Sequence, residues 1–228
     1  TEFIEKLLES MNSQAQEYGT YLVGGDLNES NEVIISGTAF GRTQKDQLLE
    51  RSGANPGDLI AMTGDLGAST AGVKILLDEL PKEKYIELVR KFTEPEARIK
   101  VGRVLAESGV ATSAIDITDG LAANLWQIAR MSKVKLTIDK DKLPINPQVL
   151  EFSREYDYDP NEFTLFGGED FELLFTVKKD SWESVKKSIE DLGVQTTLIG
   201  EVSEGSGVYM KTNDEKNELP DRGYEHFR

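Results

Sequence analysis

The 228-residue chain contains no cysteine and a single histidine, His226, close to its C-terminus. Without cysteine there is no disulfide, no thiolate zinc site and no thiol nucleophile. A Ser-His-Asp triad or a multi-histidine metal site would depend on His226 alone, so neither is expected. The groups left for chemistry are carboxylates, hydroxyls, Arg, Lys and backbone amides, together with oxygen-bound hard cations such as Mg²⁺.

Basic residues are also few, with 26 Lys and Arg against 41 Asp and Glu and a formal net charge of −15. They are scattered along the chain, so we expect no nucleic-acid partner. Because an acidic surface repels phosphorylated substrates, an enzyme of phosphate esters built on this chain would need divalent cations or local basic groups. No apolar run approaches the ~20 residues of a membrane span, and the N-terminus has no basic-apolar signal pattern. We therefore expect no membrane partner and a cytoplasmic location.

Helical and strand-like patterns alternate along the chain, which predicts an α+β or layered α/β fold. A strong turn signal over residues 55–58 places a lobe boundary nearby, at about residue 50. The predicted helices cover residues 3–18, 69–78, 82–92, 96–108, 144–158 and 181–192, with a further helix from Leu121. The predicted strands cover residues 21–23, 33–40, 59–62, 111–115, 135–138, 171–177, 197–202 and 208–211.

The most informative segment, residues 116–121 (DITDGL), lies where an apolar strand turns into a helix. Thr118 and Asp119 fall at the helix start, where either side chain can accept hydrogen bonds from first-turn amides. Capping does not explain Asp116, because a second carboxylate in the same turn adds repulsion unless a cation neutralises it. A helix cap and a metal-phosphate site are both open interpretations of this turn.

Three turns combine glycine with an acidic residue: residues 24–26, 116–120 and 167–170. Glycine allows the backbone to approach a ligand closely, and the carboxylate can bind a hard cation or a polar substrate group. Each turn alone is better explained as an ordinary chain reversal, because Gly-Asp is a routine turn signal. The loop of residues 63–69 is either a phosphate cradle or a tight turn that caps the next helix, and it matches neither the Walker nor the dinucleotide motif. Arg42 and Arg51 could face a polyphosphate or be surface cations.

Taken together and in order, these motifs resemble those of the thiamine-monophosphate kinases, which belong to a wider group similar to aminoimidazole ribonucleotide synthetase. The resemblance extends over nearly the whole chain. It rests on residues 22–26 (LVGGD), 51–58 (RSGANPGD), 63–72, 116–121 (DITDGL), 167–176 (GGEDFELLFT) and 223–227 (GYEHF).

The resemblance implies an α+β fold with two lobes: a truncated N-terminal ATP-binding lobe over residues 1–50 and a complete C-terminal α/β lobe over residues 51–228. It implies Mg²⁺-dependent transfer of the ATP γ-phosphate to thiamine monophosphate, giving thiamine diphosphate and ADP, by a homodimer. No acid or base residue is implied, because phosphoryl transfer depends on positioning and charge neutralisation. The implied ligands are Gly25, Asp26, Arg51 and Thr118 for ATP; Asp26, Asp116 and Asp119 for metal; and Glu169 and Tyr224 for the substrate.

One departure from the family pattern is large. The family usually has an N-terminal stretch with further metal-binding aspartates, and this chain begins at the helix that normally follows it. Two smaller departures, Glu9 and the Leu27-Asn28 pair, concern the local ATP contacts. Two alternatives therefore accompany the kinase hypothesis: a non-catalytic module that binds phosphate or thiamine phosphate, and another ATP-dependent enzyme of the same superfamily.

Overall fold

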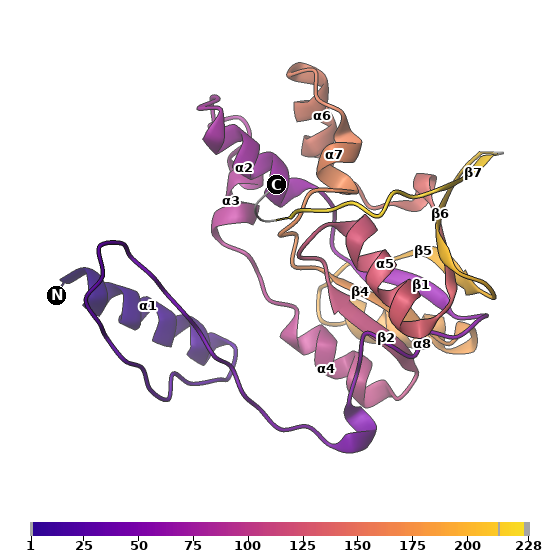
Figure 1. Ribbon diagram of the computed structural model, residues 1–228, viewed down its shortest axis with the longest axis horizontal. Coiled ribbons are helices and arrows are strands. Elements are labelled where there is room, and N and C mark those ends of the chain that lie inside the picture. Colours follow the sequence, from indigo (N-terminus) through magenta and orange to yellow (C-terminus); the bar gives the residue numbers. More distant parts are fainter. Residues whose placement is uncertain (1, 214, 226–228) are drawn as a thin grey trace. The chain divides into compact units, whose positions relative to one another are not determined.

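The computed structural model describes residues 2–213 and 215–225 and divides the chain into two units, Thr1–Thr43 and Gln44–Arg228 (Figure 1). The smaller unit contains the predicted N-terminal helix, α1 (Glu2–Glu17). The two strands predicted here, over residues 21–23 and 33–40, are wrong, because the described part of this unit contains no strand. Their apolar side chains are exposed, including Val23, Ile34 and Phe40. Strand-forming residues need a hydrogen-bonding partner strand, and this segment has none within its unit.

The larger unit is built on a seven-stranded sheet of order β2-β4-β1-β5-β3-β6-β7. The pair β3 and β6 is parallel and the other neighbouring pairs are antiparallel. The strands are β1 (Leu59–Thr63), β2 (Ala111–Asp116), β3 (Lys135–Asp139), β4 (Leu173–Val177), β5 (Thr196–Ser203), β6 (Gly207–Thr212) and β7 (Glu215–Glu218). Six of them were predicted. The edge strand β7 was missed because its four exposed residues, Glu-Lys-Asn-Glu, carry no apolar alternation.

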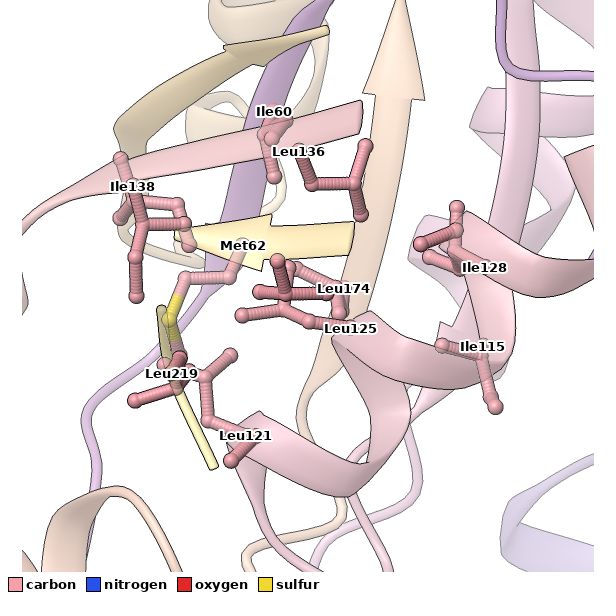
Figure 2. Packing of buried hydrophobic residues seen from close by; sticks show 14 of the residues in the cluster. Ile60, Met62, Ile115, Leu121, Leu125, Ile128, Leu136, Ile138, Leu174 and Leu219 are labelled. Atoms are coloured by element: carbon pink, nitrogen blue, oxygen red, sulfur yellow. The ribbon is translucent and has the colours of Figure 1, made fainter. Parts of the chain in front are cut away.

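Helix α5 (Leu121–Ser132) covers one face of this sheet and forms the largest core. Figure 2 shows Leu121, Leu125 and Ile128 of the helix among strand side chains that include Met62 and Leu174. All five side chains are fully buried. The core therefore holds the start of α5 rigidly beside the end of β2, where the acidic turn lies.

The opposite face of the sheet is covered by α4 (Ile99–Ser108) and α8 (Trp182–Glu190). Because side chains alternate along a strand, Ala61 and Phe175 face these helices while Met62 and Leu174 face α5. The sheet is thus buried on both faces. This agrees with the α+β prediction.

A third cluster joins α2 (Ala68–Leu77), α3 (Ile86–Thr93), α6 (Pro147–Glu155) and α7 (Pro160–Thr164) around the buried rings of Tyr85 and Phe152. Their centroids are 5.3 Å apart in an edge-on arrangement. Short 3-10 helices occur at Lys45–Gln47, Lys140–Lys142 and Lys179–Ser181. Among residues 2–213 and 215–225, no helix has the length and apolar character needed to cross a membrane.

The larger unit begins before the expected lobe boundary. The backbone N–H of Ala114 in β2 donates to the carbonyl of Glu50 at 2.9 Å, so Glu50 is already joined to the sheet. The division into lobes at residues 1–50 and 51–228 stays a prediction.

Candidate functional site

The acidic turn connects β2 to α5 as expected, but it does not cap the helix. Asp116 ends β2 with its side chain exposed, and Gly120 is the N-cap of α5, with no side-chain capping hydrogen bond. The helix-cap interpretation of Thr118 and Asp119 is therefore wrong. Gly120 has φ 103°, and a Cβ there would lie 3.0 Å from the backbone of Phe166 and Gly167, so the turn requires glycine.

A second glycine-acid turn, residues 167–172, lies alongside the first. The N–H groups of Glu169 and Phe171 donate to the carbonyls of Thr118 and Ile117 at 2.9 and 3.0 Å. Both donors have positive φ, 61° and 51°, a strained backbone for residues with side chains. Gly168 is needed at this crossing, because a Cβ there would lie 2.2 Å from the Thr118 carbonyl oxygen.

The C-terminal segment brings a third part of the chain to the same place. The Tyr224 N–H donates to the Asp119 carbonyl at 2.9 Å, and Gly223 approaches that carbonyl so closely that a Cβ would lie 2.2 Å from it. The Arg222 guanidinium lies 3.8 Å from the centre of the Phe166 ring and pairs with Glu162. His226 and Phe227 of the C-terminal motif lie outside the described residues.

These three segments enclose a cavity of about 930 Å³, which we call the Tyr224 cavity. Its polar lining includes Thr118, Asp119, Glu169 and Tyr224, so four predicted site residues from distant parts of the sequence come together here. Its apolar wall was not predicted and comes from α2, α3 and the region of α7: Val73, Leu77, Phe92, Phe163 and Phe166. Aromatic rings beside carboxylates suit a flat organic cation.

Two other predicted residues line a neighbouring cavity of about 700 Å³, which we call the Arg51 cavity. Arg51 is exposed and donates to the Gln127 side chain at 3.3 Å, and Asp116 contributes a carboxylate. The remaining walls are mostly apolar and include Ile99 and Leu173. A guanidinium and a carboxylate at the rim of an apolar cavity can bind a molecule that has both a charged and an apolar part.

The remaining predicted residues, Gly25 and Asp26, belong to the smaller unit and are exposed. Asp26 accepts hydrogen bonds from the Leu27 N–H and the Asn28 side chain, both at 3.0 Å. Among the described residues, no group of three or more His, Asp or Glu could by itself hold a metal ion. The chemistry of Asp116 and Asp119 still fits Mg²⁺, which commonly binds one or two protein carboxylates and completes its shell with water and phosphate oxygens.

Sequence reasoning missed a buried ion pair behind the second turn. The guanidinium of Arg98 donates to both oxygens of Glu172 at 2.7 Å, and Thr63 donates to the same carboxylate at 2.6 Å. The side chains of Arg98 and Glu172 are only 10% and 4% exposed, and the carboxylate raises the pKa of Arg98. Gly64 allows this contact, since a Cβ there would lie 2.1 Å from the Glu172 carboxylate. No spacing in the sequence connects these residues, which are distant along the chain.

Asp170 occupies the position that the loop of residues 63–69 was expected to offer to a phosphate. Its carboxylate accepts from the Gly67 N–H at 3.0 and 3.2 Å, at the N-terminus of α2. The Gly64 and Leu66 N–H groups are bonded to the carbonyls of Gln195 and Pro144, both at 2.9 Å. The phosphate-cradle interpretation is therefore wrong. The loop is a turn whose helix is capped from outside by Asp170.

Burial raises the pKa of Asp170 to about 8, and the nearby carboxylates of Asp65 and Glu172 add to the shift. The backbone N–H groups of Gly67 and Ser69 act in the opposite direction, because they favour the charged form. The residue as a whole keeps partial exposure, but its carboxyl group is enclosed.

Comparison with known proteins places this chain in a family. The family model "AIR synthase related protein, C-terminal domain" matches residues 55–213. A curated thiamine-monophosphate kinase of Pyrococcus horikoshii is 41% identical over 97% of this chain and 66% of its own length. That of Bacillus subtilis is 35% identical over 99% of this chain and 70% of its own length.

Among solved structures, AaThiL complexed with AMPPCP and TMP has a TM-score of 0.65 and 33% identity, over 78% of this chain and 54% of its own. The chain thus spans about two thirds of the length of the curated relatives it matches, and about half of this solved structure. The matches agree with the family that the motifs resemble. The chain belongs to the thiamine-monophosphate kinase family, within the wider group of AIR synthase related proteins.

Proposed function

We propose that this protein is an ATP-dependent phosphotransferase that transfers the γ-phosphate of ATP to thiamine monophosphate, giving thiamine diphosphate and ADP. The observation that carries the proposal is the Tyr224 cavity, where Thr118, Asp119, Glu169 and Tyr224 meet. The names of the relatives, and the complex of AaThiL with AMPPCP and TMP, support the same reaction.

The Tyr224 cavity is proposed to hold the thiamine part of the substrate. The thiazolium ring is a flat cation, and Glu169 and Asp119 supply negative charge while Tyr224 and Phe92 supply aromatic surface. These side chains are on separate segments that the backbone hydrogen bonds described above hold together. The cavity is therefore largely formed before the ligand binds, which reduces the entropic cost of ordering it.

The Arg51 cavity is proposed to hold ATP. Its apolar walls suit the adenine ring, and the Arg51 guanidinium suits a phosphate oxygen. Thr118, which lies between Asp116 and Asp119 in the acidic turn, is proposed as a further ATP contact. From the smaller unit we propose Gly25 as a backbone contact to ATP and Asp26 as a contact to the nucleotide and its metal.

Mg²⁺ is the proposed metal, with Asp26, Asp116 and Asp119 as its protein ligands. Bound there, it would neutralise phosphate charge that the acidic protein otherwise repels. The residues of the chain then act by position: Glu169 and Tyr224 hold the acceptor, and Arg51 holds the donor. None of them needs to transfer a proton in phosphoryl transfer.

We also propose a homodimer and a cytoplasmic location. The smaller unit exposes strand-forming apolar residues, including Val33, Ile34 and Phe40, that have no partner strand. Pairing of such a segment with a second copy would cover them. A cytoplasmic location fits an enzyme that consumes ATP.

The test is formation of thiamine diphosphate by the intact protein, supplied with ATP, Mg²⁺ and thiamine monophosphate. Asp116→Asn should lower kcat/KM by about 100-fold or more, as expected for loss of a group that stabilises transition-state charge. Asp141→Asn is the control, because Asp141 is exposed and lines neither cavity. Binding of thiamine monophosphate without turnover would favour the non-catalytic module, and an Asp116→Asn effect below about twofold would refute the role given to that carboxylate.

A further inference from the structure

The segment that carries Glu169 alternates between two environments. Glu169 lines the Tyr224 cavity and Leu173 lines the Arg51 cavity, whereas Asp170 and Glu172 line neither cavity and accept hydrogen bonds from Gly67 and Arg98. Phe171, in the middle, is the one residue in the described ranges that lines both cavities. The two cavities therefore adjoin at Phe171.

We propose that Phe171 is a positioning residue that forms the common wall between the nucleotide and the acceptor, an inference that rests on the function proposed above. Asp116 lines the Arg51 cavity and Asp119 lines the Tyr224 cavity. Both belong to the turn in which the Ile117 carbonyl accepts a hydrogen bond from the Phe171 N–H at 3.0 Å. The wall thus lies beside the carboxylates that flank the two reacting phosphates. Its side chain contacts both substrates and excludes water from the place where they meet.

The position of Phe171 is imposed by its neighbours. Its φ of 51° is unfavourable for a residue with a side chain, and such a backbone conformation persists only where the surrounding structure over-determines it. The residues before and after Phe171 in the sequence both fix its backbone. Asp170 is fixed to the N-terminus of α2, and Glu172 is fixed in the buried pair with Arg98. These two anchors hold the strained residue between them.

Removal of this wall should allow a side reaction. In Phe171→Ala, water can occupy the position of the acceptor phosphate. Its oxygen would then bond to the γ-phosphorus while the bond from that phosphorus to the β,γ-bridging oxygen breaks, which gives ADP and inorganic phosphate and releases one proton to solvent. With the wall intact, one ADP is formed for each thiamine diphosphate.

The experiment compares three variants of the intact protein. Phe171→Ala should raise the KM for ATP and the KM for thiamine monophosphate, each roughly tenfold, the usual effect of lost apolar contact in a pocket. It should also form more ADP than thiamine diphosphate. Phe171→Leu keeps an apolar wall and should therefore form ADP and thiamine diphosphate in nearly equal amounts. Phe92→Ala is the matched control: Phe92 lines only the Tyr224 cavity, so it should raise the KM for thiamine monophosphate alone.

Calorimetry with AMPPCP and with thiamine monophosphate, each added alone, gives a readout that does not require turnover. Phe171→Ala should weaken both ligands, and its thermal midpoint should stay close to that of the unaltered protein because Phe171 is only partly buried. The inference is overturned if either ligand binds Phe171→Ala as it binds the unaltered protein, or if ADP and thiamine diphosphate remain equal. Absence of thiamine diphosphate with the unaltered protein would instead refute the proposed function, and the two binding measurements would still decide the role of Phe171.

Discussion

Replacement of Arg98 by methionine should destabilise the larger unit by about 3–5 kcal/mol, the usual cost of removing one partner of a buried ion pair. The magnitude follows from burial. Glu172 is 4% exposed and its two oxygens lie 2.7 Å from the guanidinium. The variant would therefore leave a carboxylate in the interior, with the Thr63 hydroxyl as its remaining hydrogen-bond partner among the described residues. The methionine side chain retains most of the apolar stem, which limits the cavity.

The chain provides a matched control on the same guanidinium. Arg98 also pairs with Glu96 at 2.9 Å, but the Glu96 side chain is 72% exposed. Glu96→Gln should therefore change stability by less than about 1 kcal/mol, as exposed pairs do. The double variant Arg98→Met with Glu172→Met removes both charges and should be markedly less unstable than the sum of the two single variants.

Urea unfolding followed by tryptophan fluorescence suits this comparison, because Trp126 and Trp182 both lie in the larger unit. An Arg98→Met loss no greater than that of Glu96→Gln would refute the reasoning. It would show that water reaches Glu172 and that the pair behaves as a surface pair.

Three further predictions concern single residues around the site. Burial raises the pKa of Asp170 to about 8, so in the folded protein it ionises only as the pH approaches 8, whereas in the unfolded chain it ionises near pH 4. Its ionisation should therefore lower the free energy of unfolding progressively between about pH 4 and pH 8. Asp170→Asn should remove this pH dependence, worth at most about 6 kcal/mol, from a pH series of urea midpoints. Gly168→Ala should disrupt the crossing with the Thr118 carbonyl and raise the KM for thiamine monophosphate. Gly37→Ala should leave this KM unchanged, because a Cβ at Gly37 meets open space. The same change in KM in both variants would contradict the close approach of Gly168 to Thr118. Glu169→Gln should raise the KM for thiamine monophosphate roughly tenfold and leave that for ATP unchanged, and steady-state kinetics with each substrate varied in turn would detect the opposite pattern.

Sequence periodicity correctly predicted the elements whose buried apolar residues recur at the spacing of a helix or a strand. Helix α5 is an example, because Leu121, Leu125 and Ile128 recur at helical spacing and all face the sheet. The strands predicted over residues 21–23 and 33–40 failed for a complementary reason. Their strand-forming residues were read correctly as apolar, but a strand also needs a partner, and local sequence does not show whether one is available.

The sequence motifs pointed to residues that line the Tyr224 cavity, but not to the contacts that hold those residues in place. Glu169 and Tyr224 stand in recognisable motifs, and both line the Tyr224 cavity. Asp170 stands in the same motif as Glu169, yet its role as the cap of α2 depends on a helix that begins about a hundred residues earlier in the chain. The Arg98 contact to Glu172 is similarly invisible, because an arginine before a helix is usually a surface cation.

The most direct test of the account is the fate of the labelled γ-phosphate of ATP when the intact protein acts on thiamine monophosphate in the presence of Mg²⁺. The account predicts that the label appears in thiamine diphosphate, in equal amount to the ADP formed. Label that remains in ATP, or that appears only as inorganic phosphate, would contradict it.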